Sequence, residues 1–281
     1  MSQQVPPGTS RVNLAGRAFT ELDGFHRFLV ASGLSYAIFD TEYDFQRAGS
    51  ATAGGHLYWK DDGLLRLGPQ RQDGDEDDVA EVDRMVEGMD FPLVCHGLSY
   101  DEFTPPPAEV QQALHEFYPL RGPVFGYIDR HLDKRPRDHP DRQPPTAPGR
   151  PWYMRHGCIT KRGYERRGLM TALNRFIALE ARARGFRGLS VGTNSPTVMR
   201  SYLFDTDDDE EKRKNPMAAA GMRSSVFAEV EDLCKYRLED FGVKGEEGEE
   251  GKEVFPFRGY DFKRNVWLMW CDLAPSLSPL Q

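Results

Sequence analysis

Apolar residues recur at helical spacing in one segment near the middle of the chain. They lie at three- and four-residue spacing, with arginines on the opposite side, and are Leu169, Ala172, Leu173, Phe176, Ile177 and Leu179. The pattern predicts a helix over Leu169–Arg184, whose apolar stripe faces a core. The rest of the chain is organised around the stretch Trp152–Tyr202, which contains this helix.

Two β-prone runs flank the predicted helix. Trp152–Thr160 precedes it and Gly188–Thr193 follows it, and a second helix is expected to begin after Asn194. The order predicts a strand–turn–helix–strand unit.

The turn between the first of these strands and the helix is basic and contains glycine. It reads Lys161-Arg-Gly-Tyr-Glu-Arg-Arg-Gly168, with four cationic side chains and two glycines. A helix N-terminus offers N–H groups and a partial positive charge, glycines let a phosphate approach the backbone, and arginines add charged hydrogen bonds. The turn therefore predicts a bound pyrophosphate.

The segment Tyr164–Leu173 resembles the acyl-CoA-binding turn of the GNAT superfamily of N-acyltransferases. That turn has Gln or Arg, two residues, Gly, one residue, and then Gly or Ala; the match covers roughly the middle fifth of the chain. Arg167 and Gly168 fit the pattern, whereas Glu165 replaces Gln or Arg and Met170 replaces the small residue. Because an acid would repel a pyrophosphate, the resemblance requires Glu165 to point outward.

The resemblance implies an α/β fold, with a mixed sheet of the GNAT type, an N-terminal extension and acidic loop insertions. Trp152–Thr160 is then expected to splay from Gly188–Thr193 beside the helix, and the last two strands are expected to pair antiparallel. The alternative is an unrelated α+β domain that contains one strand–turn–helix unit.

Hydrophobic patterns and turn residues predict further elements on both sides of this core. The N-terminal part is expected to contain helices at 20–33, 79–89 and 108–118, a hairpin at 55–67, and strands at 36–39, 91–95 and 124–128. The C-terminal part is expected to contain a helix at 226–241 and strands at 254–262 and 266–273.

These elements divide the chain into four parts. They are a disordered tail (1–12), an N-terminal part of the domain (13–132), a Pro-rich basic loop (133–151) and a GNAT-like core (152–281) with insertions at 205–215 and 243–253.

Charge is spread unevenly along the chain. The net charge of −8 argues against a general nucleic-acid binder. The segment from Arg130 to Arg167, however, contains eleven lysines and arginines and only four acids. This basic block leaves tRNA open as a partner. The absence of a long apolar run or an apolar targeting segment predicts a cytoplasmic protein with no membrane partner. The four widely spaced cysteines predict no metal site.

The resemblance implies transfer of an acyl group, most simply acetyl, from acyl-CoA to an amine of a small molecule or peptide by direct attack. The backbone of one strand segment would bind the pantetheine arm, and the helix start would bind the pyrophosphate. The residues implied in binding the co-substrate are Cys158, Ile159, Thr160, Arg166, Arg167, Gly168, Leu169, Met170 and Asn194.

Three side chains are candidates for proton transfer in this reaction. The family often uses a tyrosine after the second crossover strand as the proton donor for the leaving thiolate, and here Tyr202 and Tyr236 compete for that role. His156 could deprotonate the amine. The ordinary alternatives are half-buried tyrosine rings with solvated hydroxyls and a histidine that only packs and hydrogen-bonds.

Two other functions stay open. One is an aminoacyl-tRNA-dependent transferase on a GNAT-like fold, which the basic block favours, and the other is a non-catalytic binding protein on this fold. Asp40, Glu42 and Asp44 form an acidic cluster that could bind a cationic substrate, although a polar loop is the simpler interpretation.

Overall fold

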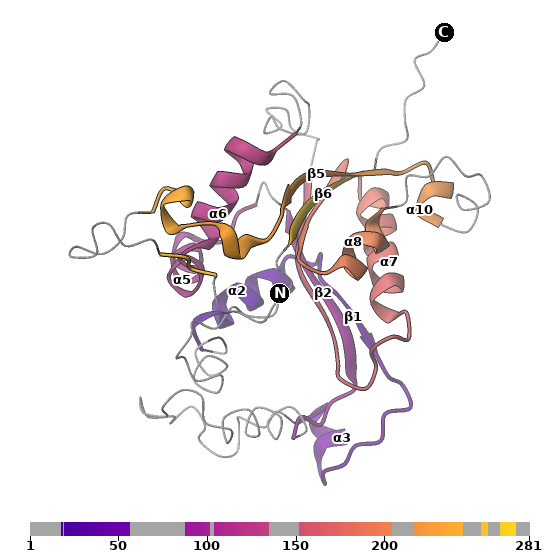
Figure 1. Ribbon diagram of the computed structural model, residues 1–281. Coiled ribbons are helices and arrows are strands. Elements are labelled where there is room, and N and C mark those ends of the chain that lie inside the picture. Colours follow the sequence, from indigo (N-terminus) through magenta and orange to yellow (C-terminus); the bar gives the residue numbers. More distant parts are fainter. Residues whose placement is uncertain are drawn as a thin grey trace, which may run out of the picture.

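Figure 1 shows a computed structural model that describes residues 18, 20–56, 88–101, 104–134, 152–203, 216–243, 254–257 and 265–273. Several predictions fall wholly or mostly outside these residues: the tail (1–12), the hairpin (55–67), the helix at 79–89, the Pro-rich loop (133–151) and the insertions at 205–215 and 243–253.

The described strands form one six-stranded sheet in the order β1-β2-β3-β4-β6-β5. All neighbouring strands are antiparallel except β3 and β4, which are parallel. The strands are β1 (Tyr36–Phe39), β2 (Leu93–Asp101), β3 (Trp152–Thr160), β4 (Gly188–Thr193), β5 (Arg223–Val230) and β6 (Val266–Asp272).

Helices cover both faces of the sheet, with α7 and α8 on one side and α2, α5 and α6 on the other (Figure 1). The α-helices are α2 (Asp23–Ala31), α3 (Ser50–Ala53), α5 (Ala108–Phe117), α6 (Arg121–Tyr127), α7 (Leu169–Ala183), α8 (Pro196–Tyr202) and α10 (Pro216–Ala219). The other helical turns are the π-helix η3 (Ile128–Leu132) and the 3-10 helices η4 (Leu233–Lys235) and η5 (Leu238–Phe241).

Alternation along β6 shows how the core is divided between the two faces. Met269 packs under α7 with Ile177, whereas Leu268 and Trp270 pack on the opposite face against Ile128. In a third cluster, buried residues of α2 and α5 pack with Leu98 on one face of β2. Because successive strand residues point to opposite faces, one sheet supplies both halves of the core.

The central unit agrees with its prediction. β3 and β4 have the predicted bounds, and the predicted helix over Leu169–Arg184 is α7, which ends one residue earlier. The last two described strands, β5 and β6, pair antiparallel, although β5 is not the strand predicted at 254–262. The predicted mixed α/β sheet is confirmed.

The predicted strand at 124–128 is wrong, because these residues belong to α6 and η3. Leu120, Val124, Ile128 and Leu132 recur every four residues and all pack against the same core cluster. This packing selects the helix over the β propensity of five residues considered alone. The antiparallel partner of β3 is consequently β2.

The predicted helix at 226–241 is also wrong, because its first residues belong to β5. The register of β5 against β6 skips Phe227, which makes a β-bulge. Val226 packs on the α7 face, whereas Ala228 and Val230 pack on the other. The bulge breaks the alternation of period two by which a strand is recognised.

The predicted strand at 254–262 is wrong in the part that the structure describes, where 254–257 form no strand. Both edges of β6 are already occupied, by β4 and by β5. Pro256 also lacks the N–H that a strand within the sheet would donate.

Candidate functional site

β3 and β4 pair along only part of their length. The parallel ladder joins Trp152–Arg155 to Gly188–Val191 and then ends. β3 continues to Thr160 with β2 as its partner on the other side. The two strands therefore part after Arg155, beside α7, and the β4-facing edge of His156–Thr160 is left out of the ladder.

A β-bulge marks the point where the strands part. Leu98 of β2 pairs with Gly157 and Ser99 pairs with Arg155, so His156 is the extra residue on β3. A bulge bends its strand and increases the local twist, which turns the end of β3 away from β4. The three residues that the sequence assigns to the pantetheine arm, Cys158, Ile159 and Thr160, all follow this bulge.

These three residues differ in what their side chains contact. The Thr160 hydroxyl lies 3.5 Å from the Cys95 thiol on the α7 face of β3. Cys158 points to the same face and is half-buried. Ile159 points the other way and is 58% exposed. Binding by this strand would therefore use backbone groups, which a neighbouring extended chain can pair with.

The turn after β3 has a backbone that ordinary residues rarely adopt. Arg166 has φ 62° and Gly168, the N-cap of α7, has φ 76°. A Cβ atom built on Gly163 or Gly168 would meet nothing within 4 Å, so the backbone is open on this side. Left-handed residues in a turn can aim successive N–H groups at one anion.

The start of α7 is suited to an anion. The first helical hydrogen bond runs from the Ala172 N–H to the Gly168 carbonyl, and the first turn contains no acid. The side chain of Glu165 is exposed, and Met170 packs with the core under α7. Met170 therefore does not fill the space in front of the helix N-terminus with its side chain.

Arg167 and Tyr164 brace the turn. The Arg167 guanidinium donates to the Gly163 carbonyl at 3.0 Å and lies 4.8 Å from the centre of the Tyr164 ring. The Tyr164 hydroxyl donates to Asp40 at the end of β1, at 2.6 Å. This hydrogen bond is the main cause that lowers the pKa of Asp40 and raises the pKa of Tyr164.

Lys161 forms a second brace, at the end of β3. Its ammonium group donates to the Phe91 carbonyl at 2.9 Å and lies 4.5 Å from the centre of the Tyr43 ring. Burial lowers the pKa of Lys161, although Asp90 and Asp40 oppose the shift. The contacts fix the point at which the turn leaves the sheet.

Asp90 connects this lysine to the segment after β1. It is 3% exposed and accepts N–H groups from Gln46 and Arg47 at 3.1 and 2.9 Å. The Tyr43 hydroxyl donates to the same carboxylate at 3.1 Å. Burial and this hydrogen bond raise the pKa of Tyr43 to about 12.

The structure separates the two candidate tyrosines. Tyr202 ends α8, is 0% exposed, and packs in the core cluster under α7. Tyr236 lies on the opposite face, stacked on Phe241, with its pKa raised first by burial and then by Tyr127. Both keep their status as predictions.

The other candidates lie on three segments near the point where the strands part: β3, the end of β4 and the start of α7. His156 stands at the bulge of β3, and its side chain lies outside the described part of the structure. Asn194 directly follows β4 and is half-buried. Arg166, Arg167, Gly168, Leu169 and Met170 are grouped at the start of α7 by their adjacency in sequence.

Sequence reasoning missed the roles of Asp40, Tyr43 and Asp90. From the sequence, Asp40 belongs to an acidic cluster that could bind a cationic substrate. In the structure its carboxylate accepts a hydrogen bond from Tyr164 of the turn. No local pattern could reveal this pair, because the two residues are 124 positions apart.

Among the residues that the structure describes, no group of His, Cys, Asp and Glu is arranged to hold a metal ion. Within the same residues, no helix has both the length and the apolar character needed to cross a bilayer.

Neither a family model nor a curated protein matches the chain. One similar solved structure is the C-terminal condensation domain of Ebony in complex with beta-alanyl-dopamine, with 12% identity and TM-score 0.46 over 94% of this chain and 82% of that one. Another is arylalkylamine N-acetyltransferase 2 from Aedes aegypti, with 10% identity and TM-score 0.41 over 70% of this chain and 77% of that one. A third is a mutant of agmatine N-acetyltransferase in apo form, with 11% identity and TM-score 0.33 over 89% of this chain and 93% of that one.

The architecture itself matches what the resemblance implies. The sheet is mixed, its one parallel pair parts beside α7, and its last two strands pair antiparallel. The described sheet thus has the GNAT-like arrangement that the resemblance predicts.

Proposed function

We propose that the protein is an N-acyltransferase that moves an acyl group, most simply acetyl, from acyl-CoA to an amine of a small molecule or peptide. The observation that carries the proposal is the parting of β3 from β4 directly before a glycine-bearing, basic turn at the N-terminus of α7. A strand edge and an anion site in sequence can hold an extended arm that ends in a pyrophosphate.

The residues present fit such a co-substrate. The backbone of Cys158, Ile159 and Thr160 would bind the pantetheine arm like an added strand. The N–H groups from Arg166 to Met170 would bind the pyrophosphate, with space at Gly168, where a Cβ atom would have no neighbour within 4 Å. Bound acyl-CoA would supply a thioester carbonyl that an amine can attack.

The remaining chemistry is proton transfer and positioning. A neutral amine forms the new C–N bond while the C–S bond breaks, so the amine must lose a proton and the departing sulfur must gain one. We assign the proton donor to Tyr202, because α8 follows β4 almost directly, with Tyr236 as the competing donor. We assign deprotonation of the amine to His156, and contact with the bound arm to Asn194. The predicted cytoplasmic location remains a prediction.

Calorimetric titration with acetyl-CoA and with free CoA tests the binding step. The double variant Arg166→Glu with Arg167→Glu should weaken binding by at least about tenfold, because two attractive charges at the turn become repulsive. Arg27→Glu is the control: it reverses a charge on α2 whose side chain is 79% exposed. Lack of binding by the folded protein at millimolar CoA would overturn the proposal.

Turnover then separates an enzyme from a binding protein. Release of free CoA in the presence of a panel of amines should depend on the amine. Binding without turnover over the whole panel would favour the non-catalytic alternative.

No contact among the described residues gives the tRNA alternative specific support, and residues 135–151 of the basic block Arg130–Arg167 lie outside them. A gel shift with bulk tRNA at low and moderate salt tests it directly. Binding that falls steeply with salt would favour an aminoacyl-tRNA-dependent transferase.

A further inference from the structure

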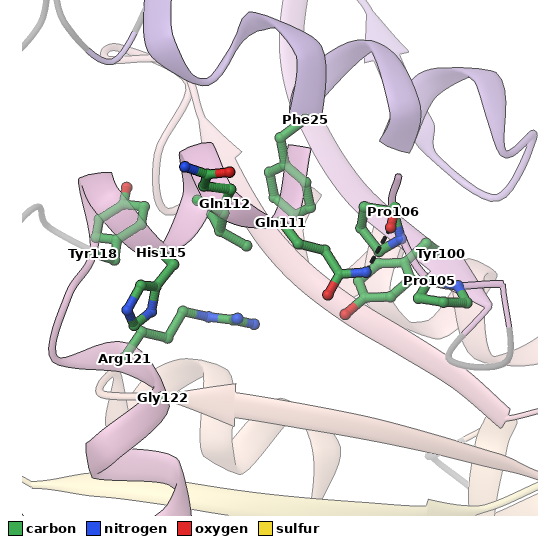
Figure 2. A pocket seen from close by; sticks show the side chains of 11 residues that line it. Phe25, Tyr100, Pro105, Pro106, Gln111, Gln112, His115, Tyr118, Arg121 and Gly122 are labelled. Atoms are coloured by element: carbon green, nitrogen blue, oxygen red, sulfur yellow. Dashed lines mark hydrogen bonds between the residues drawn. The ribbon is translucent and has the colours of Figure 1, made fainter. Parts of the chain in front are cut away.

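A cavity lies away from the basic turn, on the opposite face of the sheet from α7. Its volume is about 540 Å³, which is within the usual range for small-molecule sites. Residues from α2, β2, α5 and the start of α6 line it (Figure 2). Nothing in the proposed binding of CoA uses this cavity.

One side of the cavity is aromatic and rigid. Phe25 of α2 and Tyr100 of β2 line it together with Pro105 and Pro106. Phe25 is buried in the cluster that joins α2 and α5, and Tyr100 packs against that cluster. Phe25 is only 2% exposed, so the half-buried Tyr100 and the exposed Pro105 offer the apolar surface, at little cost in conformational entropy, and favour a flat apolar ligand.

The other side of the cavity carries hydrogen-bond donors. Arg121 and His115 lie beside each other there, and the Arg121 side chain extends toward the space in front of Gln111 (Figure 2). The Arg121 guanidinium is 5.5 Å from the centre of the Phe125 ring. A guanidinium near an aromatic ring can still offer its N–H groups to an anion.

The charges of the lining exclude one class of ligand. The described residues that line the cavity include one arginine and one histidine but no Asp or Glu. Within the described part of the chain, Arg121 also has no carboxylate partner. Among these described lining residues a cationic ligand would find no carboxylate, and the nearby Glu116 already accepts a hydrogen bond from Gln112, whereas a carboxylate ligand could accept two hydrogen bonds from Arg121.

We propose that this cavity binds a small carboxylic acid with a flat apolar body, its carboxylate on Arg121 and its apolar part against Tyr100 and Pro105. The proposal depends on the cavity alone and holds whether or not the protein binds CoA. Tyr100 pairs with Met154, two residues before the β3 bulge at His156, so a ligand here lies close to where β3 and β4 part.

The test compares two probes of the same shape and opposite charge, 3-phenylpropionate and 2-phenylethylamine. Ligand-observed NMR titration of the full chain without CoA should detect the acid at millimolar concentration and the amine at least about tenfold more weakly. Arg121→Gln should weaken binding of the acid by about tenfold or more, which is the usual effect of losing a charged hydrogen bond.

Two further variants keep the result interpretable. Gly122→Leu adds a side chain at a position that lines the cavity and where a Cβ atom meets nothing within 4 Å, so it should block the acid without changing charge. Arg27→Gln removes an equal charge from the exposed face of α2 and should leave binding unchanged.

Three results would overturn the proposal: equal binding of both probes, binding of the acid that Arg121→Gln and Gly122→Leu leave intact, or no binding of the acid to the folded protein at about 10 mM. None of them bears on CoA binding, which the titration of the basic turn measures separately.

Discussion

The Tyr164 hydroxyl donates a 2.6 Å hydrogen bond to Oδ2 of Asp40, and this bond ties the basic turn Lys161–Gly168 to the end of β1. The same ring lies under the Arg167 guanidinium. Tyr164 thus holds the turn from two directions, although it need not contact a ligand itself. Besides the hydrogen bond, the charges of Arg167 and Lys161 also help to lower the pKa of Asp40.

Tyr164→Phe should weaken CoA binding by roughly threefold to tenfold, because the turn loses one charged hydrogen bond while the ring under Arg167 is kept. Titration calorimetry measures the change. Asp40→Ala should have a similar effect, and the double variant should be no worse than either one, since both remove the same bond. Glu42→Gln, two positions away, is the control. Effects that simply add in the double variant would contradict this assignment.

Tyr43 should make stability depend on alkaline pH. Its folded pKa of about 12 lies above the ordinary value of about 10, so its contribution is complete below about pH 10 and is lost as pH rises toward about 12. At about pH 8, Tyr43→Phe should lower the free energy of unfolding by about 1 kcal/mol, through loss of its bond to Asp90. Urea unfolding at about pH 8 and about pH 11 should show the difference between the two proteins shrinking. A constant difference would mean that Tyr43 titrates normally.

Gly168→Ala should destabilise the protein by about 1–2 kcal/mol, because the N-cap of α7 has φ 76° and a Cβ atom is strained there whatever the space. Gly168→Asn should cost less, since asparagine tolerates this conformation better. Gly157→Ala is the matched control, as Gly157 has equally open surroundings and no positive φ. Thermal denaturation that ranks Gly157→Ala below Gly168→Ala in stability would refute the explanation.

The two tyrosines can be distinguished by kinetics. If Tyr202 gives its proton to the departing sulfur, Tyr202→Phe should lower kcat by about 10²-fold or more while the Kd for CoA stays unchanged. Tyr236→Phe, on the other face of the sheet, should leave kcat close to that of the unmodified protein. The dependence of kcat on pH separates this role from a packing defect, because only loss of a proton donor removes its limb of the profile. The opposite pattern would assign the role to Tyr236.

The central unit could be predicted from the sequence because its signals are local. The apolar spacing reflects one face of a helix, and Leu173 and Ile177 on that face are buried, whereas Phe176 and Leu179 are 50% and 38% exposed. The flanking strands are short runs bounded by turn residues. The glycines and arginines of the turn are adjacent in sequence, so their grouping needs no tertiary information.

The remaining elements depended on contacts that a sequence does not display. The bulge at Phe227 moves Val226 and Ala228 to different faces. The apolar residues of this strand therefore lack the spacing of two residues that marks a strand and resemble a helix in sequence. The helix that contains Val124 forms because its apolar residues pack on the face of β5 and β6 that lies opposite α7. Likewise, the pairing of Asp40 with Tyr164 arises only once β1 and the end of β3 belong to the same sheet.

The short parallel ladder between β3 and β4 makes the sheet a pair of sub-sheets. β1, β2 and β3 form one antiparallel set, β4, β6 and β5 form the other, and four residues of each central strand join them. α7 follows β3 and precedes β4, and its buried face contacts both sets. Amide hydrogen exchange should consequently reveal two cooperative units that open separately. A ligand that spans the parted strands would couple them, so that both units exchange at a common, slower rate.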